Sequence, residues 1–230
     1  MGKPKENAFD LAEYPLFSGL SAEEAREFVA KTKSVIRSYE KGNRILRAYE
    51  SNAFIGMMLE GRAQIIAEDR FGNESIGHTL ERGALFGIVS AILGPDYAFT
   101  SVAAKNKTAA LLIPYRELLL SGMKLGRVHG IVMKNLLTSF SLKAVLMMQK
   151  IELLSHKSLR DRLTLYLIQQ SDRQKSDRVT VPSKMQLAKA LECNRSALVR
   201  EISAMSRARL LRCGDDWMEL DTSALAKASK

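Results

Sequence analysis

Arginine and serine side chains recur on one face of a helix that the sequence predicts from about Arg195. At 100° per residue, Leu198, Ile202 and Met205 lie within about 40° of one line and define the buried face. Arginine forms bidentate hydrogen bonds with guanine, and serine hydroxyls adapt to bases or phosphates. This helix therefore has the side chains that a DNA major groove requires. The exposed face carries Ser196, Arg200, Ser203 and Arg207.

A second helix is predicted directly before the first. Ser183 and Gln186 have the spacing of a capping box, which starts the helix. Residues 192–194 (Glu-Cys-Asn) interrupt the helical pattern. Two short helices joined by such a break are typical of a helix-turn-helix, in which the first helix supports the second in the groove. The inward positions of the first helix are Leu187, Ala188 and Leu191.

The segment that follows these helices predicts a β-hairpin. Residues 210–213 and 217–220 are separated by Gly214, Asp215 and Asp216, which are turn-forming residues. A hairpin after a helix-turn-helix is the wing of a winged helix. Upstream, a helix is predicted around Leu159–Leu167 and a loop over residues 171–178.

Six residues are our predicted DNA contacts. Arg195 and Arg200 would read bases, whereas Ser183 and Lys184 would contact phosphates, because free amides and positive charge converge at a helix N-terminus. The alternative is a solvated helical hairpin with no ligand. Residues 155–230 hold fifteen basic and nine acidic residues, and this net charge of +6 favours DNA. The predicted contacts are Ser183, Lys184, Arg195, Ser196, Ala197 and Arg200.

A heptad pattern precedes the basic segment and predicts one long helix. Apolar residues alternate by four and three over about three heptads, which favours pairing with a second copy of the helix. Burial of the helix on its own domain is the alternative. The seam residues are Met133, Leu137, Phe140, Ala144, Met147, Ile151 and Leu154.

The first half of the chain has a different pattern of apolar and turn-forming residues. From Val35 to about Pro114, short apolar stretches are separated by turn residues about every ten positions, which predicts short strands in a β-sandwich or β-roll. The predicted fold class is therefore α+β. The turn glycines are Gly42, Gly61, Gly72, Gly83 and Gly94.

Composition narrows the function classes. The chain has 230 residues, a net charge of +10 and a pI near 9.7, which favours polyanionic partners. Cys193 and Cys213 form no zinc or disulfide pattern, and three scattered histidines predict no metal site and no catalytic residues. A cupin-like enzyme would need ligand histidines on adjacent strands, so we expect no enzyme and identify no cofactor.

Nothing in the sequence predicts export. No apolar run follows the basic N-terminus, and the longest apolar run, residues 144–148, is far below the roughly 20 residues that span a bilayer. We therefore expect a cytoplasmic protein without a membrane partner.

The order of these parts resembles the Crp/Fnr superfamily of transcription regulators. The similarity includes Leu16-Phe17-Ser18-Gly19-Leu20, Leu59-Glu60-Gly61, Gly83-Ala84-Leu85-Phe86-Gly87 and the segment from Ser183 to Ile202. It implies a cyclic-nucleotide-binding-like β-roll at 1–122, a dimerisation helix at 123–155 and a winged helix-turn-helix at 156–230. It also implies a homodimer that binds a palindromic operator in double-stranded DNA, with RNA polymerase as a further candidate partner.

One departure from the superfamily concerns the effector. Cyclic-nucleotide-binding members have Gly-Glu and later an arginine in the phosphate cassette, whereas this chain has Gly87-Ile88 and then Ala98-Phe99-Thr100. Without a counter-charge a buried phosphate is costly, so we do not expect cyclic AMP. We predict an apolar or aromatic small effector, and the alternative is that these residues are core. The predicted pocket comprises Phe86, Gly87, Ile88, Val89, Ala98, Phe99, Thr100, Met147 and Met148.

A third hypothesis retains the small effector but has a protein partner in place of DNA. In it, the chain is a ligand-binding regulatory module whose C-terminal part contacts a protein.

Overall fold

The computed structural model describes residues 9–69, 71 and 73–221. Our predictions for residues 1–8 and for the turn at Gly72 lie outside this range. The chain divides into two compact units, residues 1–141 and 142–230. Helix α5 (Arg127–Ser155) contributes residues to both units. A separate dimerisation segment at 123–155 stays a prediction.

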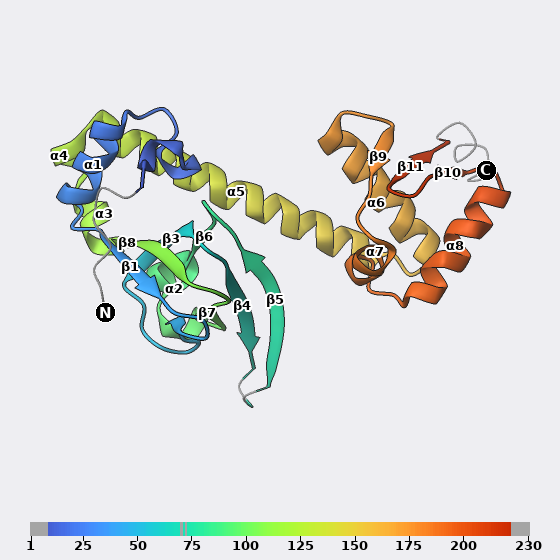
Figure 1. Cartoon of the computed structure of the whole chain (residues 1–230), viewed down its shortest axis with the longest axis horizontal. Helices are drawn as coiled ribbons and strands as arrows, with labels where there is room; N and C mark the ends of the chain where they lie inside the picture. The colour runs from blue at the N-terminus through green and yellow to red at the C-terminus, as the bar shows by residue number, and fades with distance from the viewer. Residues whose placement is uncertain (1–8, 70, 72, 222–230) are drawn as a thin grey trace. The chain divides into compact units, whose positions relative to one another are not determined.

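The first unit contains two four-stranded antiparallel sheets, as expected for a β-roll (Figure 1). One sheet has the order β1-β8-β3-β6 and the other the order β2-β7-β4-β5. The strands are β1 (Val35–Tyr39), β2 (Arg44–Leu46), β3 (Phe54–Glu60), β4 (Ala63–Glu68), β5 (Glu74–Leu80), β6 (Leu85–Phe86), β7 (Thr100–Ala104) and β8 (Thr108–Pro114).

Strands β3 and β8 are buried on both faces, which explains why their sequences are continuously apolar. Met57, Leu59 and Leu111 belong to a core shared with helices, whereas Met58 and Leu112 belong to a core shared with the second sheet. Successive side chains of a strand point to opposite faces. The first sheet therefore lies between a helical layer and the second sheet.

The predicted turn glycines separate these strands. Gly42, Gly61, Gly83 and Gly94 all have positive φ, a region that L side chains rarely adopt. At Gly61 a Cβ atom would lie 2.3 Å from the carbonyl oxygen of Lys107. The turn prediction is confirmed at these four positions.

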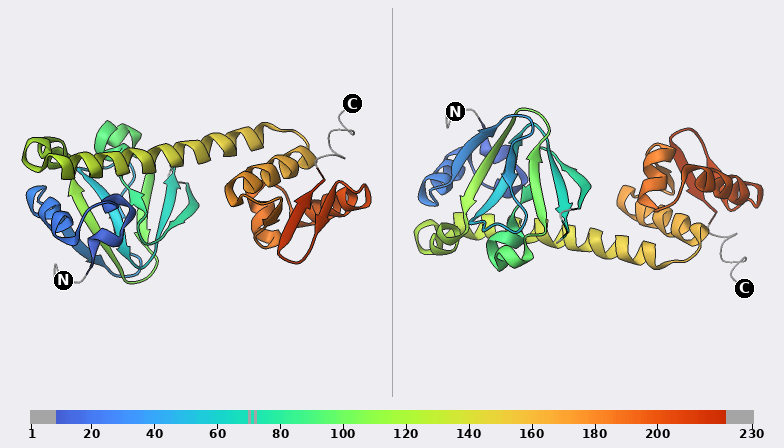
Figure 2. Two further views of the ribbon diagram at one scale, coloured as in Figure 1. Left: turned by 90° about the horizontal axis from the view of Figure 1, so that it is seen from above. Right: turned by 90° about the horizontal axis from the view of Figure 1, so that it is seen from below.

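Short helices cover the first sheet. A capping box starts α1: the Glu24 amide donates to Ser21 Oγ (3.2 Å) and the Ser21 amide donates to Glu24 Oε2 (2.8 Å). That amide and Arg127 lower the pKa of Glu24. Figure 2 shows α5 as one continuous helix in both views. The helices are η1 (Leu11–Glu13), η2 (Pro15–Phe17), α1 (Ala22–Lys31), α2 (Ile88–Leu93), η3 (Pro95–Tyr97), α3 (Tyr115–Leu120) and α4 (Gly122–Leu125).

Helix α5 differs from the expectation about membranes. It has 29 residues, and an 18-residue window with a mean hydropathy of 1.4 is apolar enough to cross a bilayer by length and composition. Asn, Ser, Thr and Gln interrupt the apolar runs of α5 but leave its mean hydropathy high. The length of the longest apolar run therefore did not reveal that α5 is apolar enough to cross a bilayer. One helix of this kind is weak grounds for a membrane span, because helices of soluble proteins pass the same test.

The second unit combines the end of α5 with three helices and a small sheet of order β10-β11-β9. Its core includes Leu153 of α5 together with Leu163, Leu198 and Met205. The predicted hairpin is present, and the Gly214 amide donates to the Trp217 carbonyl at 3.0 Å. The elements are α6 (Leu159–Gln174), β9 (Arg178–Thr180), α7 (Lys184–Ala190), α8 (Arg195–Arg207), β10 (Leu211–Cys213) and β11 (Trp217–Leu220).

The loop predicted over residues 171–178 is wrong for its first half. Helix α6 continues to Gln174, and Lys175, with φ of 54°, ends it. Arg173 forms a hydrogen bond with Gln149 of α5, so a contact with a distant part of the sequence holds the last turn in helical form.

Candidate nucleic-acid interface

Helix α8 begins at Arg195, as predicted. The side-chain oxygen of Asn194 accepts a hydrogen bond from the Ala197 amide at 2.7 Å. Asparagine is among the preferred N-cap residues, because its side chain satisfies an amide that has no partner within the helix. The break at residues 192–194 therefore marks both the end of one helix and the capped start of the next.

The two faces of α8 differ as the sequence predicts. Leu198, Ile202 and Met205 are buried in the core of the second unit. Arg195 and Arg200 are exposed on the other side, and within the described ranges neither forms an ion pair. The exposed positions of α8 are Arg195, Ser196, Val199, Arg200, Ser203 and Arg207, while Ala197 is half-buried.

Val199 is a residue of this face that the sequence reasoning missed. Its side chain is 38% exposed. At 100° per residue it lies on the arc between Arg195 and Ser203. An apolar side chain at this position suits the methyl group of thymine. Helical geometry alone places Val199 on this face, but a single valine among polar side chains is not a recognisable sign of a base contact.

Helix α7 carries the predicted phosphate contacts. Ser183 caps this helix by accepting from the Gln186 amide at 3.4 Å, and its hydroxyl donates to Gln186 Oε1 at 3.2 Å. The predicted box is therefore present only in its first half. Lys184 is exposed in the first turn. Leu187 and Ala188 are buried in the core that also contains residues of α8 and α6, so α7 supports α8.

Several other basic residues of the second unit are neutralised by carboxylates. Arg160 pairs with Glu201 at 2.7 Å. Arg212 and Arg178 both pair with Glu219, at 3.2 and 3.7 Å. The positive charge that remains unpaired in this unit therefore includes the exposed face of α8.

The aromatic residue of the hairpin has a packing role. The guanidinium carbon of Arg178 lies 4.1 Å from the centre of the Trp217 ring, which is a cation–π contact. Trp217 also closes over Gly214, where a Cβ atom would lie 2.2 Å from its indole nitrogen. The ring is thus engaged within the hairpin.

The structure divides the predicted effector residues into two groups. Phe86, Ile88 and Ala98 are buried, and the Phe86 ring lies so close to Gly56 that a Cβ atom there would be 2.1 Å away. Val89 and Phe99 are 42% and 48% exposed, and Thr100 is exposed. Met147 and Met148 are exposed and belong to the other unit.

Phe99 is part of an exposed aromatic cluster. Its ring packs edge-to-face with Tyr49 (6.3 Å between centroids) and Tyr97 (6.4 Å). Gly87, with φ of 73°, starts α2 just before this region, and Asn52 Nδ2 donates to the Gly87 carbonyl at 3.0 Å. Val89 and Phe99 are thus both surface residues, and Val89 lies in the first turn of α2.

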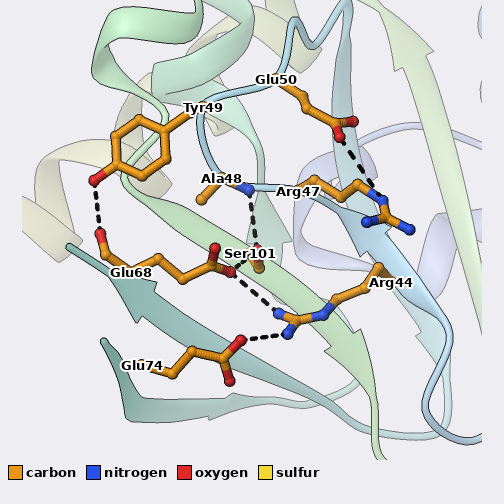
Figure 3. A network of polar contacts seen from close by, with 8 residues as sticks. All are labelled: Arg44, Arg47, Ala48, Tyr49, Glu50, Glu68, Glu74 and Ser101. Carbon is orange, nitrogen blue, oxygen red and sulfur yellow. Dashed lines mark hydrogen bonds and ion pairs between the residues drawn. The ribbon is translucent and has the colours of Figure 1, made fainter. Parts of the chain in front are cut away.

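A polar network in the second sheet includes Arg44 (Figure 3). Arg44 donates to Glu74 Oε1 at 2.6 Å and to Glu68 Oε1 at 3.3 Å. Ser101 contacts Glu68, and Tyr49 Oη donates to the Glu68 carbonyl at 2.8 Å. Two carboxylates therefore already neutralise this guanidinium, which leaves it poorly suited to an added phosphate.

Comparison with known proteins agrees with this geometry. Residues 36–119 match the model of the cyclic nucleotide-binding domain family. This stretch of the chain is therefore similar to a cyclic nucleotide-binding domain. The domain begins within β1 and ends in α3, so it comprises both sheets. A search of curated protein sequences finds no match to the chain.

Solved structures extend the likeness beyond the cyclic nucleotide-binding domain. The catabolite activator protein of Thermus thermophilus is 22% identical, with a TM-score of 0.53, over 93% of this chain and 96% of that chain. CprK complexed with OCPA is 16% identical, with a TM-score of 0.61, over 90% and 94%. The c-di-GMP responsive global regulator CLP of Xanthomonas campestris is 17% identical, with a TM-score of 0.55, over 87% and 99%. The predicted resemblance to the Crp/Fnr superfamily is confirmed as a likeness of fold.

Proposed function

We propose that this protein is a homodimeric transcription regulator whose C-terminal winged helix-turn-helix binds a palindromic DNA operator. The observation that carries the proposal is the exposed face of α8, where Arg195 and Arg200 have no ion pair among the described residues. Free arginines beside exposed serines match the donors and acceptors of base edges in the major groove.

The support beneath α8 fits the same function. Leu187 of α7 and Leu198 of α8 share one core with Leu163 of α6, so the exposed face is held by buried contacts on its other side. The β10–β11 hairpin follows α8 in the chain and takes the role of the wing. The net charge of +6 over residues 155–230 favours a polyanion over a protein partner.

A second copy of the chain is the proposed occupant of the apolar face of α5. Leu137 and Ile151 are 61% and 70% exposed, and Phe140 and Met147 are exposed with them. Exposed apolar side chains in an a/d pattern pack best against another such helix. The alternative is that the seam is buried within its own unit. Among the seam residues, only Met133 and Leu154, at its two ends, are half-buried in this way.

We also propose that an effector other than cyclic AMP acts through the first unit. The cassette has no arginine at residues 98–100, and Arg44 is neutralised by Glu68 and Glu74. An uncharged aromatic or apolar ligand suits the exposed rings of Phe99, Tyr49 and Tyr97 better than a phosphate does. A cytoplasmic location and RNA polymerase as a further partner belong to this proposal.

The test uses purified full-length protein and a duplex selected from a random library. Arg195→Ala and Arg200→Ala should each weaken binding to that duplex by about 5- to 150-fold, the range for loss of one bidentate base contact. Arg116→Ala, an exposed arginine of α3, removes the same charge and should change binding little. Retained sequence-specific binding by both α8 variants would refute this site.

A further inference from the structure

The turn between α7 and α8 has a complete hydrogen-bonding pattern. The Cys193 amide donates to the Ala188 carbonyl at 3.0 Å, and the Glu192 amide donates to the Lys189 carbonyl at 3.3 Å. These two bonds form a Schellman motif, which satisfies carbonyl groups left free at the end of a helix. In the part of the chain that the structure describes, no backbone amide donates to the carbonyl of Ala190.

Lys150 of α5 supplies the missing donor. Its ammonium group donates to the Ala190 carbonyl and lies 3.7 Å from Glu192 Oε1. One side chain from a helix 40 residues earlier thus contacts both the last residue of α7 and the turn. Because an ammonium group has three donors, it can hold a carbonyl and a carboxylate together.

The backbone conformation of Glu192 is unusual for a residue with a side chain, so its contact with Lys150 has a larger role in holding the turn. Glu192 has φ of 50°, in the left-handed region where helices usually place glycine. A side chain there is disfavoured, so the surroundings must hold the residue in place. The ion pair with Lys150 is an interaction that a glycine at this position would not make.

The same part of α5 is also fixed by contacts with α6 and with the core of the second unit. Gln169 of α6 donates to the Gln149 carbonyl at 3.3 Å, and Leu153 is buried in the core of the second unit. Lys150 therefore projects from a well-anchored segment of α5, and its contact can fix the turn relative to that helix.

We infer that Lys150 is a positioning residue, which holds the α7–α8 turn and thereby orients the start of α8 that carries Arg195. This inference rests on the proposed function for its consequence on DNA. Arg195 follows Asn194, the cap of α8, directly after this turn. The contact also joins α5, which carries the apolar seam, to the turn directly before α8.

The first measurement needs no DNA. In the full-length protein, Lys150→Met should speed hydrogen exchange in peptides covering residues 190–197 by about tenfold, the effect expected for loss of a charged hydrogen bond. Lys150→Arg keeps a donor and should restore slow exchange. Lys134→Met, on the same helix in the other unit, is the matched control and should leave this region unchanged. Unchanged exchange in Lys150→Met would overturn the inference.

A second experiment measures how the Lys150 variants bind the selected duplex. Lys150→Met should weaken binding to it by about tenfold but weaken binding to random duplex only about twofold, and Lys150→Arg should recover most of the loss. Equal losses on both duplexes would mean that Lys150 acts only as a charge, which contradicts positioning. If Lys150→Met does not fold, Glu192→Gln carries the same test with a smaller expected effect, about threefold.

The two hypotheses fail in different ways. If wild-type protein prefers no duplex sequence, the proposed function fails, while the exchange data still decide the role of Lys150. If Arg195→Ala abolishes selective binding but Lys150→Met changes neither exchange nor affinity, only the positioning role fails.

Discussion

The side-chain oxygen of Asn194 lies 2.7 Å from the backbone nitrogen of Ala197 and accepts its hydrogen bond. This single contact sets the first residue of α8 and therefore the register of its exposed face. Replacing an N-cap residue that has a side-chain acceptor with alanine typically costs about 1 kcal/mol of stability.

We therefore expect Asn194→Ala to lower the free energy of unfolding of the second unit by about 1 kcal/mol. Trp217 is the single tryptophan of the chain, so its fluorescence in a urea titration reports on this unit alone. Asn194→Ser retains an acceptor and should stay within about 0.5 kcal/mol of wild type. Equal destabilisation by both variants would exclude a capping role.

The seam on α5 predicts a change of oligomeric state. Leu137→Glu with Ile151→Glu should convert the proposed dimer to a monomer, because both side chains are exposed in the single chain and would carry charge into an apolar interface. Sedimentation without detergent measures the mass. Thr138→Glu, exposed on α5 but off the seam, is the control.

Two other outcomes would contradict the dimer. A monomeric wild-type protein would show that no second copy occupies this face. A wild-type protein that stays dispersed only with detergent or lipid would favour a membrane for α5 instead.

The hairpin tip predicts a gain of affinity. Asp215 and Asp216 form the turn before β11, and a wing that approaches phosphates with two carboxylates is repelled. Removing one such charge at close range is worth about 1 kcal/mol in water. Asp215→Asn with Asp216→Asn should therefore tighten DNA binding by about fivefold or more at low salt, and the gain should shrink as salt is added.

The control for this change is Asp172→Asn, an exposed carboxylate on α6. Fluorescence anisotropy with the selected duplex, repeated at several salt concentrations, provides the comparison. An unchanged affinity in the tip variant would mean that the hairpin stays away from the phosphates.

The two cysteines should differ in reactivity. Burial raises the pKa of the Cys193 thiol, with a smaller opposing effect of Arg162, so the reactive thiolate is scarcer at pH 8 than in a free cysteine. Cys213 is exposed on β10. Mass spectrometry after brief alkylation should find Cys213 modified first, and faster labelling of Cys193 would contradict its burial. Raising the pH toward 9 should narrow the difference.

Local patterns predicted helix α8 well. The buried positions Leu198, Ile202 and Met205 follow from the helical period alone, and the break before Arg195 follows from residue types that cap helices. The strands of the first unit were also predictable, because its turn glycines adopt conformations that other residues avoid.

Contacts between distant segments were not predictable in the same way. The contact of Lys150 with Ala190 joins residues 40 positions apart, and no local pattern signals it. Likewise, Phe86 and Ala98 are apolar residues that suit a ligand pocket or a core equally well, and only their packing places them in the interior. The last turn of α6 was missed because a tertiary contact of Arg173 offsets the weak helix preference of its polar residues.

The most direct measurement is selection of bound duplexes from a random library by the wild-type protein, repeated at several salt concentrations. The account predicts a palindrome with two half-sites about one DNA turn apart, because two copies of α8 must enter successive major grooves. The selection is repeated with and without a panel of aromatic compounds and organic acids as candidate effectors. If no motif is recovered under either condition and binding to all sequences is only salt-sensitive, the proposed function is contradicted.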